Sequence, residues 1–564
     1  MLTFDVREIP FARRGSWFNL SPVIGVHERA EHVHLVSHQT GLHPILELVP
    51  LHDGAPVEAL VTATEAALRW SARGGTIEAA FEAPDVLRLR GSGLGMRLGV
   101  VPRTLTPFTG TYLFADPVDG AIVLTSYESG RRYRITVLAG NAEVVGGGAL
   151  GVVDRAIALG PDEPWQIAVE EFETARPPYR ATSGFDEVVR RSSADFVDYR
   201  AAVAPAGSRG ADKAAYVLWS ATVRPAGFLR REAVLMSKHW MDKVWSWDHC
   251  FNALALAATD PGAALDQFLL PFDHQEPSGA LPDSVAHSEV LYNFVKPPIH
   301  GWALRKLRER APSPLAREEL SVVYERLARW TEFWLVSRRV PGRALPYYQH
   351  GNDSGWDNST TFDRDRVVES PDLAAFLVVQ LDVLAELAAE LGIAATPWSA
   401  HARQVERALV GELWDGDHFV ARSVATGEPS STTSLINALP IVLGGRLDPE
   451  IAGRLVATIQ EHLTDWGPAT ELVSSADYQS DGYWRGPIWA PSTFLIEDGV
   501  RRAGFGGLAD TIGARFRALC ERSGFAENFD AVTGEGLRDR AYTWTASAYL
   551  VLLADHAARE QVAR

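Results

Sequence analysis

The chain has 564 residues, 46% of them hydrophobic, and its 71 Asp and Glu outnumber its 54 Lys and Arg, which gives a formal net charge of -17. This length favours more than one domain, and the negative balance disfavours nucleic acid and anionic membranes as partners. The only two cysteines, Cys250 and Cys520, exclude a disulfide framework and a cysteine zinc site. The sequence has no apolar run of membrane-spanning length and no signal-peptide pattern in its opening residues, so we expect a cytoplasmic protein.

Residues 1–180 have the pattern of a β domain. Short runs of alternating apolar and polar residues recur there, separated by Gly, Pro, Asp and Asn; they cover residues 32–37, 86–93, 120–129, 132–140 and 164–172. Many short strands at this spacing are typical of an antiparallel β-sandwich. Residues 181–210 then change in character and predict a linker that contains its own helix.

From residue 211 to 564 the periodicity is helical. Amphipathic helices are predicted near 211–224, 247–258, 262–271, 286–309, 314–338, 371–391, 396–412, 431–443, 449–463, 488–503, 507–522 and 540–559. A count of about twelve suits an (α/α)6 toroid, in which helical hairpins close into a ring. The loops at one end of such a barrel would line a common pocket.

Tryptophan is concentrated in this helical half. Of 17 Trp, only Trp17, Trp70 and Trp165 precede residue 200. An indole is large and carries a polar N–H, so it is a costly choice for filling a core. The enrichment therefore indicates either a core built with large aromatics or a surface that binds the apolar face of a sugar ring.

Four connections between predicted helices combine aromatic and charged residues. They read KHWMDKVWSWDHCFNALAL (238–256), HGNDSGWDNSTTFD (350–363), SDGYWRGPIWAPSTFL (480–495) and GFAENFDAVTGEGLRDRAYTWTAS (524–547). The second has poor propensity for helix or strand, so core packing does not explain it. In the first, Asp248 could serve simply as a helix N-cap.

Carboxylates in aromatic loops suit the hydrolysis of glycosides, which needs two of them. One must be protonated, to donate to the leaving oxygen, and burial beside tryptophan favours the protonated form. Asp357, between Trp356 and Asn358, fits this general acid, and Glu527 fits the general base. The sequence does not give their separation in space, so inversion and retention both stay open at this point.

The four motifs in this order resemble glycoside hydrolase family 63, which shares a clan with the trehalases and includes α-glucosidases and mannosylglycerate hydrolases. The resemblance covers roughly residues 240–545 and rests on WSWDHCF, HGNDSGWDNS, DGYWRGPIW and ENFDAVTGEG. It implies an (α/α)6 catalytic domain, inversion of configuration and no catalytic metal or other cofactor. It also implies that Asp357 is the acid and Glu527 the base.

Substrate-binding residues follow from the same motifs. The resemblance implies that the tryptophan-rich segment lines the sugar subsite and that the RGPIW segment lies near the sugar; the candidates are Trp245, Trp247, Asp248, Gly355, Trp356, Asn358, Tyr483, Trp484, Arg485 and Trp489. The chain departs from many relatives at Asp353, where they carry Glu. Its β region and negative charge also differ from what a short hydrolase of an anionic glycerate glycoside would show.

The sequence contains a weaker candidate for a metal site and a second candidate for the catalytic base. Five histidines lie between residues 27 and 43, and His32 and His34 would share one face of a strand, where they could hold a metal or simply face solvent. Glu535 is a second candidate base, but its glycine neighbours predict an exposed turn.

The sequence thus predicts an exo-acting α-glycosidase, most simply an α-glucosidase, whose partner is a carbohydrate substrate. A disaccharide phosphorylase on the same architecture is the first alternative, since it needs one carboxylate and a phosphate site. A polysaccharide lyase or sugar epimerase, using bases such as His239, His249 or His350, is the second, and a non-catalytic sugar-binding protein is the third. The sequence specifies neither the linkage, nor the aglycone, nor the oligomeric state.

Overall fold

The computed structural model describes residues 2–25, 28–101, 111–147, 153–204 and 208–563. The chain forms two compact units. The first, called here the β unit, comprises Met1–Phe228, Ser237–Asp242 and Ala286–Glu289, and the second, the helical unit, comprises Leu229–Met236, Lys243–Val285 and Val290–Arg564.

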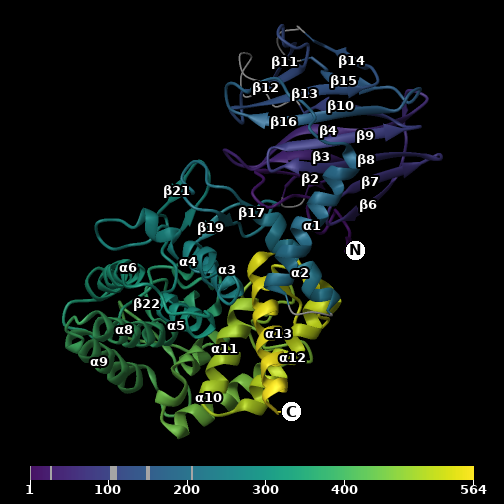
Figure 1. Cartoon of the computed structure of the whole chain (residues 1–564). Helices are drawn as coiled ribbons and strands as arrows, with labels where there is room; N and C mark the ends of the chain where they lie inside the picture. Colours follow the sequence, from purple (N-terminus) through teal and green to yellow (C-terminus); the bar gives the residue numbers. More distant parts are fainter. Residues whose placement is uncertain (1, 26–27, 102–110, 148–152, 205–207, 564) are drawn as a thin grey trace. The chain divides into compact units, whose positions relative to one another are not determined.

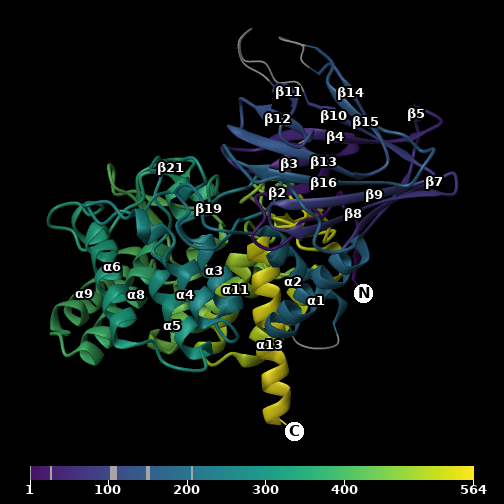
Figure 2. The ribbon, with the colours of Figure 1, turned by 45° about the horizontal axis from the view of Figure 1, so that its top comes forward.

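The β unit contains two antiparallel sheets, whose strands are layered in Figures 1 and 2. One sheet has the order β1 (Thr3–Phe4), β6 (Leu60–Thr64), β7 (Leu68–Ala72), β8 (Gly75–Ala83), β9 (Val86–Ser92), β16 (Trp165–Phe172), β13 (Arg131–Ala139), β12 (Ile122–Ser126), β11 (Thr111–Ala115). The other has the order β14 (Ala142–Val145), β15 (Ala156–Leu159), β10 (Gly95–Val100), β4 (His43–His52), β3 (Arg29–Ser37), β2 (Phe18–Val23), with β5 (Ala55–Pro56) beside β4. The predicted antiparallel sandwich is confirmed.

Two helices follow the strands within the β unit. Helix α1 (Phe185–Val203) lies against β8, where Phe185 and Val188 pack on Ala80. Helix α2 (Arg209–Ala221) is tied to the start of the chain, because the Tyr216 hydroxyl donates to the Ala12 carbonyl at 3.1 Å. The contacts of α2 thus group it with the β unit, and a domain boundary at residue 210 stays a prediction.

The helical unit is a closed double ring of helices. The inner ring consists of α3 (Asp248–Leu256), α5 (His300–Arg310), α8 (Pro371–Leu391), η3 (Leu435–Arg446), α11 (Ala490–Arg502) and α13 (Thr543–Ala563), each in contact with the next and α13 in contact with α3. The outer helices are α4 (Pro261–Leu269), α6 (Arg317–Val336), α9 (Thr396–Leu413), α10 (Pro449–His462) and α12 (Gly506–Ser523). This arrangement confirms the (α/α)6 class.

Burial distinguishes the inner helices. Every residue of α3 is buried, and so is the first half of α8, whereas the outer α9 buries a single stripe that includes Ala402, Val405 and Leu409. A helix surrounded by others is apolar on all sides, and a helix facing solvent is apolar on one. The sequence patterns of α3, α8 and α9 therefore agree with their places in the rings, whereas the second half of the inner helix α5 is polar.

One predicted helix is wrong in its first half. Helix α5 begins at His300, not near residue 286, and residues 290–291 form β21 instead. Pro297 and Pro298 explain the late start, because proline removes a backbone donor and clashes with the preceding turn inside a helix. The periodicity of the residues before them was thus misleading.

Short elements occupy the connections. They are η1 (Pro271–His274), α7 (Gly351–Ser354), η2 (Thr360–Phe362), β17 (Thr222–Val223), β18 (Ala233–Val234), β19 (Val244–Trp245), β20 (Ser284–Val285), β21 (Val290–Leu291), β22 (Val368–Glu369), β23 (Ala421–Ser423), β24 (Pro429–Ser430), β25 (Asn528–Phe529) and β26 (Gly536–Leu537). Within the described parts of the chain, no helix is both long and apolar enough to cross a membrane.

A glycine pair tests the packing of the inner ring. A Cβ at Gly301 on α5 would overlap the backbone of Gln380 on α8, whereas a Cβ at Gly411 on α9 would meet no atom within 4 Å. We expect Gly301→Ala to lower the free energy of unfolding by about 1–3 kcal/mol through overpacking, and Gly411→Ala to raise it by about 0.5–1 kcal/mol through helix propensity. Urea denaturation of both variants measures the difference, and equal effects would contradict the ring packing.

Candidate active site

The four sequence motifs gather at one end of the helical unit. Within this unit each leads into the N-terminal end of an inner helix: residues 243–247 into α3, 350–363 toward α8, 480–489 into α11 and 524–541 into α13. Inner and outer helices alternate along the chain, so the inner helices share one direction and their N-terminal ends lie together. The site is thus assembled by helix direction, and no two of its motifs are neighbours in sequence.

The loop 350–363, called here the acid loop, is held in place by a short helix and by hydrogen bonds to Asp353. The one-turn helix α7 ends at Gly355, whose φ of 74° is in the left-handed region that favours glycine. Asp353 is buried and accepts hydrogen bonds from Arg338 at 2.7 Å, from the Gln349 backbone at 2.8 Å and from the Val295 backbone at 3.1 Å. The shorter Asp at this position therefore has a complete set of partners of its own.

Asn358 joins the acid loop to the segment before α11. Its side-chain amide donates to the Gly482 carbonyl at 3.0 Å and its oxygen accepts from the Trp484 backbone at 3.0 Å. Arg485 donates from Nε to the Asn358 carbonyl at 2.8 Å and forms an ion pair with Asp363. The Arg485 guanidinium therefore secures the acid loop, and its contact with a sugar stays a prediction.

Tyr483 lies where the predicted residues converge. Its backbone has a φ of 63°, and its carbonyl accepts from the Trp489 indole at 2.8 Å. Burial raises the pKa of its phenol well above the usual value, and the charges of Glu527, Asp357 and Asp248 raise it further. The charges of three carboxyl groups from three separate motifs therefore all influence the Tyr483 phenol.

The two candidate catalytic carboxyls both have raised pKa values. Burial raises the pKa of Asp357, and Lys296 opposes that shift. Burial, reinforced by the charge of Asp539, raises the pKa of Glu527 to about 8, while Arg538 opposes it. We expected burial to raise the pKa of the acid alone. Burial instead raises the pKa of both groups, because removal of water favours the protonated form of either carboxyl.

Asp248 is the first residue of α3, so it is not the N-cap; Trp247 is, and no side chain caps this helix. Burial raises the pKa of Asp248 well above its usual value, and Lys296 opposes that shift. Its Oδ2 atom is buried and has no hydrogen-bond partner within the described part of the chain. Such an atom is suited to accept a hydrogen bond from a bound hydroxyl.

The tryptophans form a packed wall. Trp484 and Trp489 stack at 4.0 Å with their planes 4° apart, and Trp356 lies 4.7 Å from Trp484. Trp247 packs edge-on against Trp544 at 5.4 Å. All five rings are buried, which corrects the expectation that four of them, Trp247, Trp356, Trp484 and Trp489, stack on a sugar; Trp544 was not among the predicted residues.

Among the predicted aromatics, Trp245 and Tyr483 keep partial exposure. They are the rings within the candidate set that a ligand could still touch, although Arg538 covers one face of Tyr483. The buried indoles behind them instead hold the backbone of the motifs in place.

Several ionisable residues of the site were missed from the sequence. They are Asp283, Lys296, Arg538, Asp539 and Tyr542, which interact with the predicted carboxyls. Arg538 lies over the Tyr483 ring at 4.9 Å and forms an ion pair with Asp481 at 2.8 Å. Arg538 and Asp539 lie within the fourth motif, so their charges could have marked them as neighbours of Glu527. Lys296 and Asp283 lie outside all four motifs, so no sequence pattern pointed to them.

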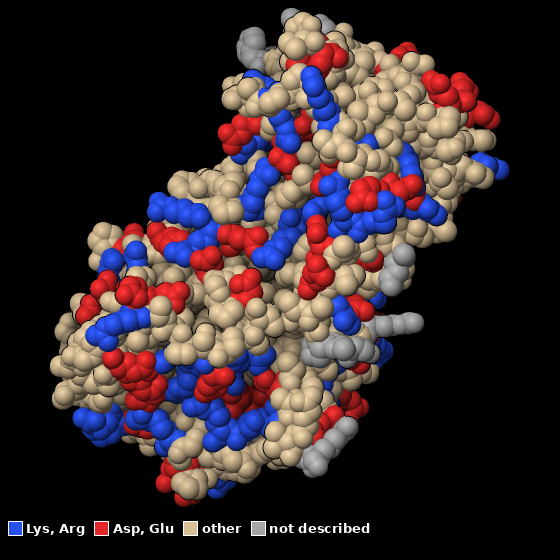
Figure 3. Space-filling model, viewed as in Figure 1, with Lys and Arg blue, Asp and Glu red and all other residues tan. Residues whose placement is uncertain are grey.

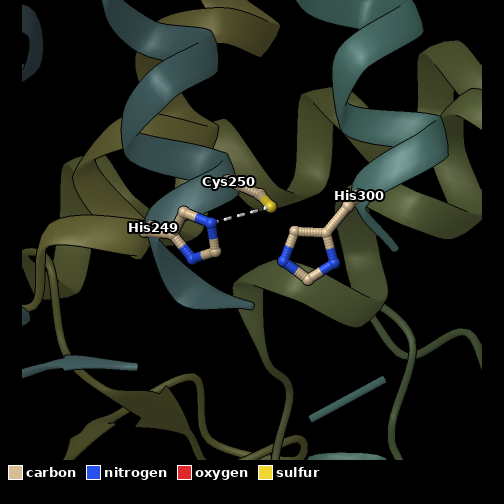
Figure 4. A group of neighbouring side chains, drawn as sticks. All are labelled: His249, Cys250 and His300. Carbon is tan, nitrogen blue, oxygen red and sulfur yellow. Dashed lines mark hydrogen bonds between the residues drawn. The ribbon is translucent and has the colours of Figure 1, made fainter. Parts of the chain in front are cut away.

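His249, Cys250 and His300 form the only His, Cys, Asp and Glu group with metal-binding spacing among the described residues (Figure 4). Each has a hydrogen-bonding role already. His249 Nδ1 donates to the Trp245 carbonyl at 3.0 Å, which leaves Nε2 as the acceptor 3.7 Å from the Cys250 sulfur. His300 Nδ1 accepts from the Trp330 indole at 3.2 Å, so its Nε2 carries the proton. Burial also raises the pKa of the Cys250 thiol, so this group fits a metal poorly.

The remaining candidates lie elsewhere. Of the histidines between residues 27 and 43, His27 lies outside the described residues, and His34 on β3 bonds the His32 carbonyl at 3.0 Å. His38 pairs with Asp242 at 3.1 Å within the β unit. Glu535 is exposed in a turn, as its glycine neighbours predicted.

Comparison with known proteins agrees with these motifs. The family model of the mannosylglycerate hydrolase MGH1-like glycoside hydrolase domain matches residues 241–545, more than half of the chain. The chain belongs to this family. A mannosylglycerate hydrolase from Rubrobacter radiotolerans is 26% identical over 398 residues, which cover 54% of this chain and 89% of that protein.

Solved structures agree on the fold. The family 63 mannosylglycerate hydrolase from Thermus thermophilus, solved in complex with glucose, matches with a TM-score of 0.55 and 22% identity over 60% of this chain and 99% of its own. A bacterial glucoamylase complexed with acarbose matches with a TM-score of 0.64 and 10% identity over 98% of this chain and 94% of its own. The family 63 relative thus matches only part of this glycoside hydrolase, whereas the glucoamylase also matches most of its β region.

Two left-handed glycines test the acid loop. A Cβ at Gly355 would lie 2.5 Å from the Trp247 ring, whereas Gly392, with a φ of 75°, would place its Cβ within 4 Å of nothing. Both Gly→Ala variants carry the same backbone strain, of about 1 kcal/mol, but only Gly355→Ala also displaces the acid loop. We expect Gly355→Ala to lower kcat/KM by about 10²-fold and Gly392→Ala to leave it within twofold. Parallel kinetics and thermal melts test this, and equal activity of the two variants would contradict the packing on Trp247.

Proposed function

We propose that this glycoside hydrolase is an exo-acting, inverting α-glycosidase, with α-glucosides as its substrates. The observation that carries the proposal is that Asp357 and Glu527, from two loops remote in sequence, are partly and fully buried, respectively, and that the charges of both raise the pKa of Tyr483. Two carboxyls around one pocket are what glycoside hydrolysis requires.

In this mechanism the protonated Asp357 donates its proton to the glycosidic oxygen as the bond to the anomeric carbon breaks. The ionised Glu527 takes a proton from a water molecule that attacks the opposite face of the ring. Asp248 accepts a hydrogen bond from a sugar hydroxyl through its buried Oδ2 atom. Trp245 and Tyr483 contact the ring through their accessible faces.

The choice of sugar and aglycone rests on weaker support. The relatives named above are mannosylglycerate hydrolases, but one of their structures holds glucose. This chain adds a β region and a net charge of -17, and the glucoamylase with which it shares its whole fold was solved with acarbose. A mannoside of glycerate is therefore the second candidate substrate. Hydrolysis rates on matched α-glucosides and α-mannosides, with and without a glyceryl aglycone, decide between them.

The phosphorylase alternative is weaker on this structure. Phosphate would replace the water and would need a cluster of basic donors beside the sugar. Lys296 and Arg538, the basic residues that act on the two carboxyls, are already paired with Asp283 and Asp481. A dependence of turnover on phosphate would reinstate this alternative.

Leaving-group chemistry separates the two catalytic roles. We expect Asp357→Asn and Glu527→Gln each to lower kcat on an unactivated oligosaccharide by about 10²–10⁴-fold. A dinitrophenyl leaving group needs no protonation, so Asp357→Asn should regain activity on the dinitrophenyl α-glucoside and Glu527→Gln should not. Glu535→Gln is the matched control and should keep full activity. The reverse pattern would exchange the two roles, and near-normal turnover in either folded variant would remove that residue's role.

The acidic limb of the pH profile reports the base. A raised pKa of about 8 for Glu527 means that the ionised base is scarce at lower pH, so kcat/KM should rise as the pH rises through that range. Asp539→Asn removes a negative neighbour, lowers the pKa of Glu527 and should move this limb to lower pH. Arg538→Met removes a positive neighbour and should move it to higher pH. Profiles of kcat/KM for the three proteins test these opposite shifts.

A further inference from the structure

Lys296 is a buried ammonium group that none of the motifs contains. It lies four residues before His300, the first residue of α5. Its Nζ is 3.2 Å from Asp283 Oδ1 and donates to the Asn352 carbonyl at 3.0 Å. Asn352 belongs to the acid loop, five residues before Asp357. The lysine therefore spans from the segment before β20 to the loop that carries the proposed acid.

The preceding residue, Val295, also bonds to the acid loop. The Val295 backbone donates to Asp353 Oδ1 at 3.1 Å, beside the contact from Lys296 to Asn352. The Pro297–Pro298 pair that follows prevents this strip from joining the helix. Residues 295–296 thus form a short clamp on the acid loop, with one side chain directed into the site.

The charges around Lys296 are unbalanced. Asp357, Asp283 and Asp248 all act on it, and their charges outweigh the effect of burial, so the pKa of Lys296 is raised. Asp283 is also influenced by Asp353 and Lys243, and Asp357 by His350. One buried cation therefore interacts electrostatically with three carboxyl groups, and among them it contacts Asp283 directly.

We propose that Lys296 is a positioning residue for the general acid: it ties the acid loop to Asp283 and adds a positive charge to the surroundings of Asp357. The inference rests on the proposed function, in which Asp357 is that acid. A positive charge favours the carboxylate form of a neighbour and a negative charge the protonated form. Lys296 and Asp283 hence act on Asp357 in opposite directions.

The first experiment compares pH profiles of kcat/KM on an unactivated oligosaccharide. Lys296→Met removes the positive charge, so Asp357 keeps its proton longer and the basic limb should move up by about 1 pH unit or more. Asp283→Asn removes a negative charge and should move the same limb down. The matched control is Lys306→Met, which breaks a second, partly buried pair. In this pair, Lys306 Nζ on the inner helix α5 lies 2.9 Å from Asp498 Oδ1 on the inner helix α11. This variant should lose stability without moving the limb.

A second substrate isolates the acid. Fluoride leaves without protonation, so the basic limb should disappear when α-glucosyl fluoride is the substrate. At basic pH the profiles of Lys296→Met and the wild-type protein should then coincide. Opposite limb shifts on the oligosaccharide, absent on the fluoride, support the proposal. A rise of KM in Lys296→Met with an unmoved limb overturns it and makes Lys296 a sugar ligand or a structural residue.

Failure of the proposed function gives a different result. If Asp357→Asn retains near-normal turnover on the oligosaccharide, the acid assignment itself is wrong. If Asp357→Asn is inactive and the limb of Lys296→Met is unmoved, only the role of Lys296 is overturned. Should Lys296→Met fail to fold, Lys296→Arg keeps the charge and Lys296→Gln keeps the polar contact, and only the Gln variant should move the limb.

Discussion

The structure depends on burying several carboxyl groups around one small space. Asp248, Asp357 and Glu527 all act on Tyr483, and each has a raised pKa because water is withdrawn from it. Burying an ion costs several kcal/mol unless partners offset the loss of water. The site therefore needs a rigid frame that keeps these groups together, and the closed ring of inner helices supplies it.

The frame extends into the loops through hydrogen bonds between motifs. Asn358, Arg485 and Asp363 join the acid loop to the segment before α11, and stacked indoles support both from behind. Positioning of this kind is what lets a proton move between fixed atoms at a low cost in entropy. On the face drawn in Figure 3, acidic and basic side chains are intermixed.

Much of this protein could be predicted from residue patterns. Alternation predicted the sandwich, helical periodicity predicted nearly every helix, and the four motifs pointed to the segments that meet. The misread segment 286–299 shows the limit, since its apolar spacing suggested a helix that two prolines forbid. The roles of the tryptophans were also misjudged, because an aromatic side chain in a loop reads the same whether its face is open or covered by another ring.

By itself the sequence determined the two kinds of secondary structure, the order of the motifs and the identity of the two candidate catalytic carboxyls. Only the tertiary structure decided that Asp357 and Glu527 share one neighbour, that Arg485 secures a loop, and that Lys296 and Asp283 join the site. The reason is that a pattern reports the local surroundings of a residue along the chain. Charge effects instead depend on distance through space, which the direction and closure of the inner helices fix.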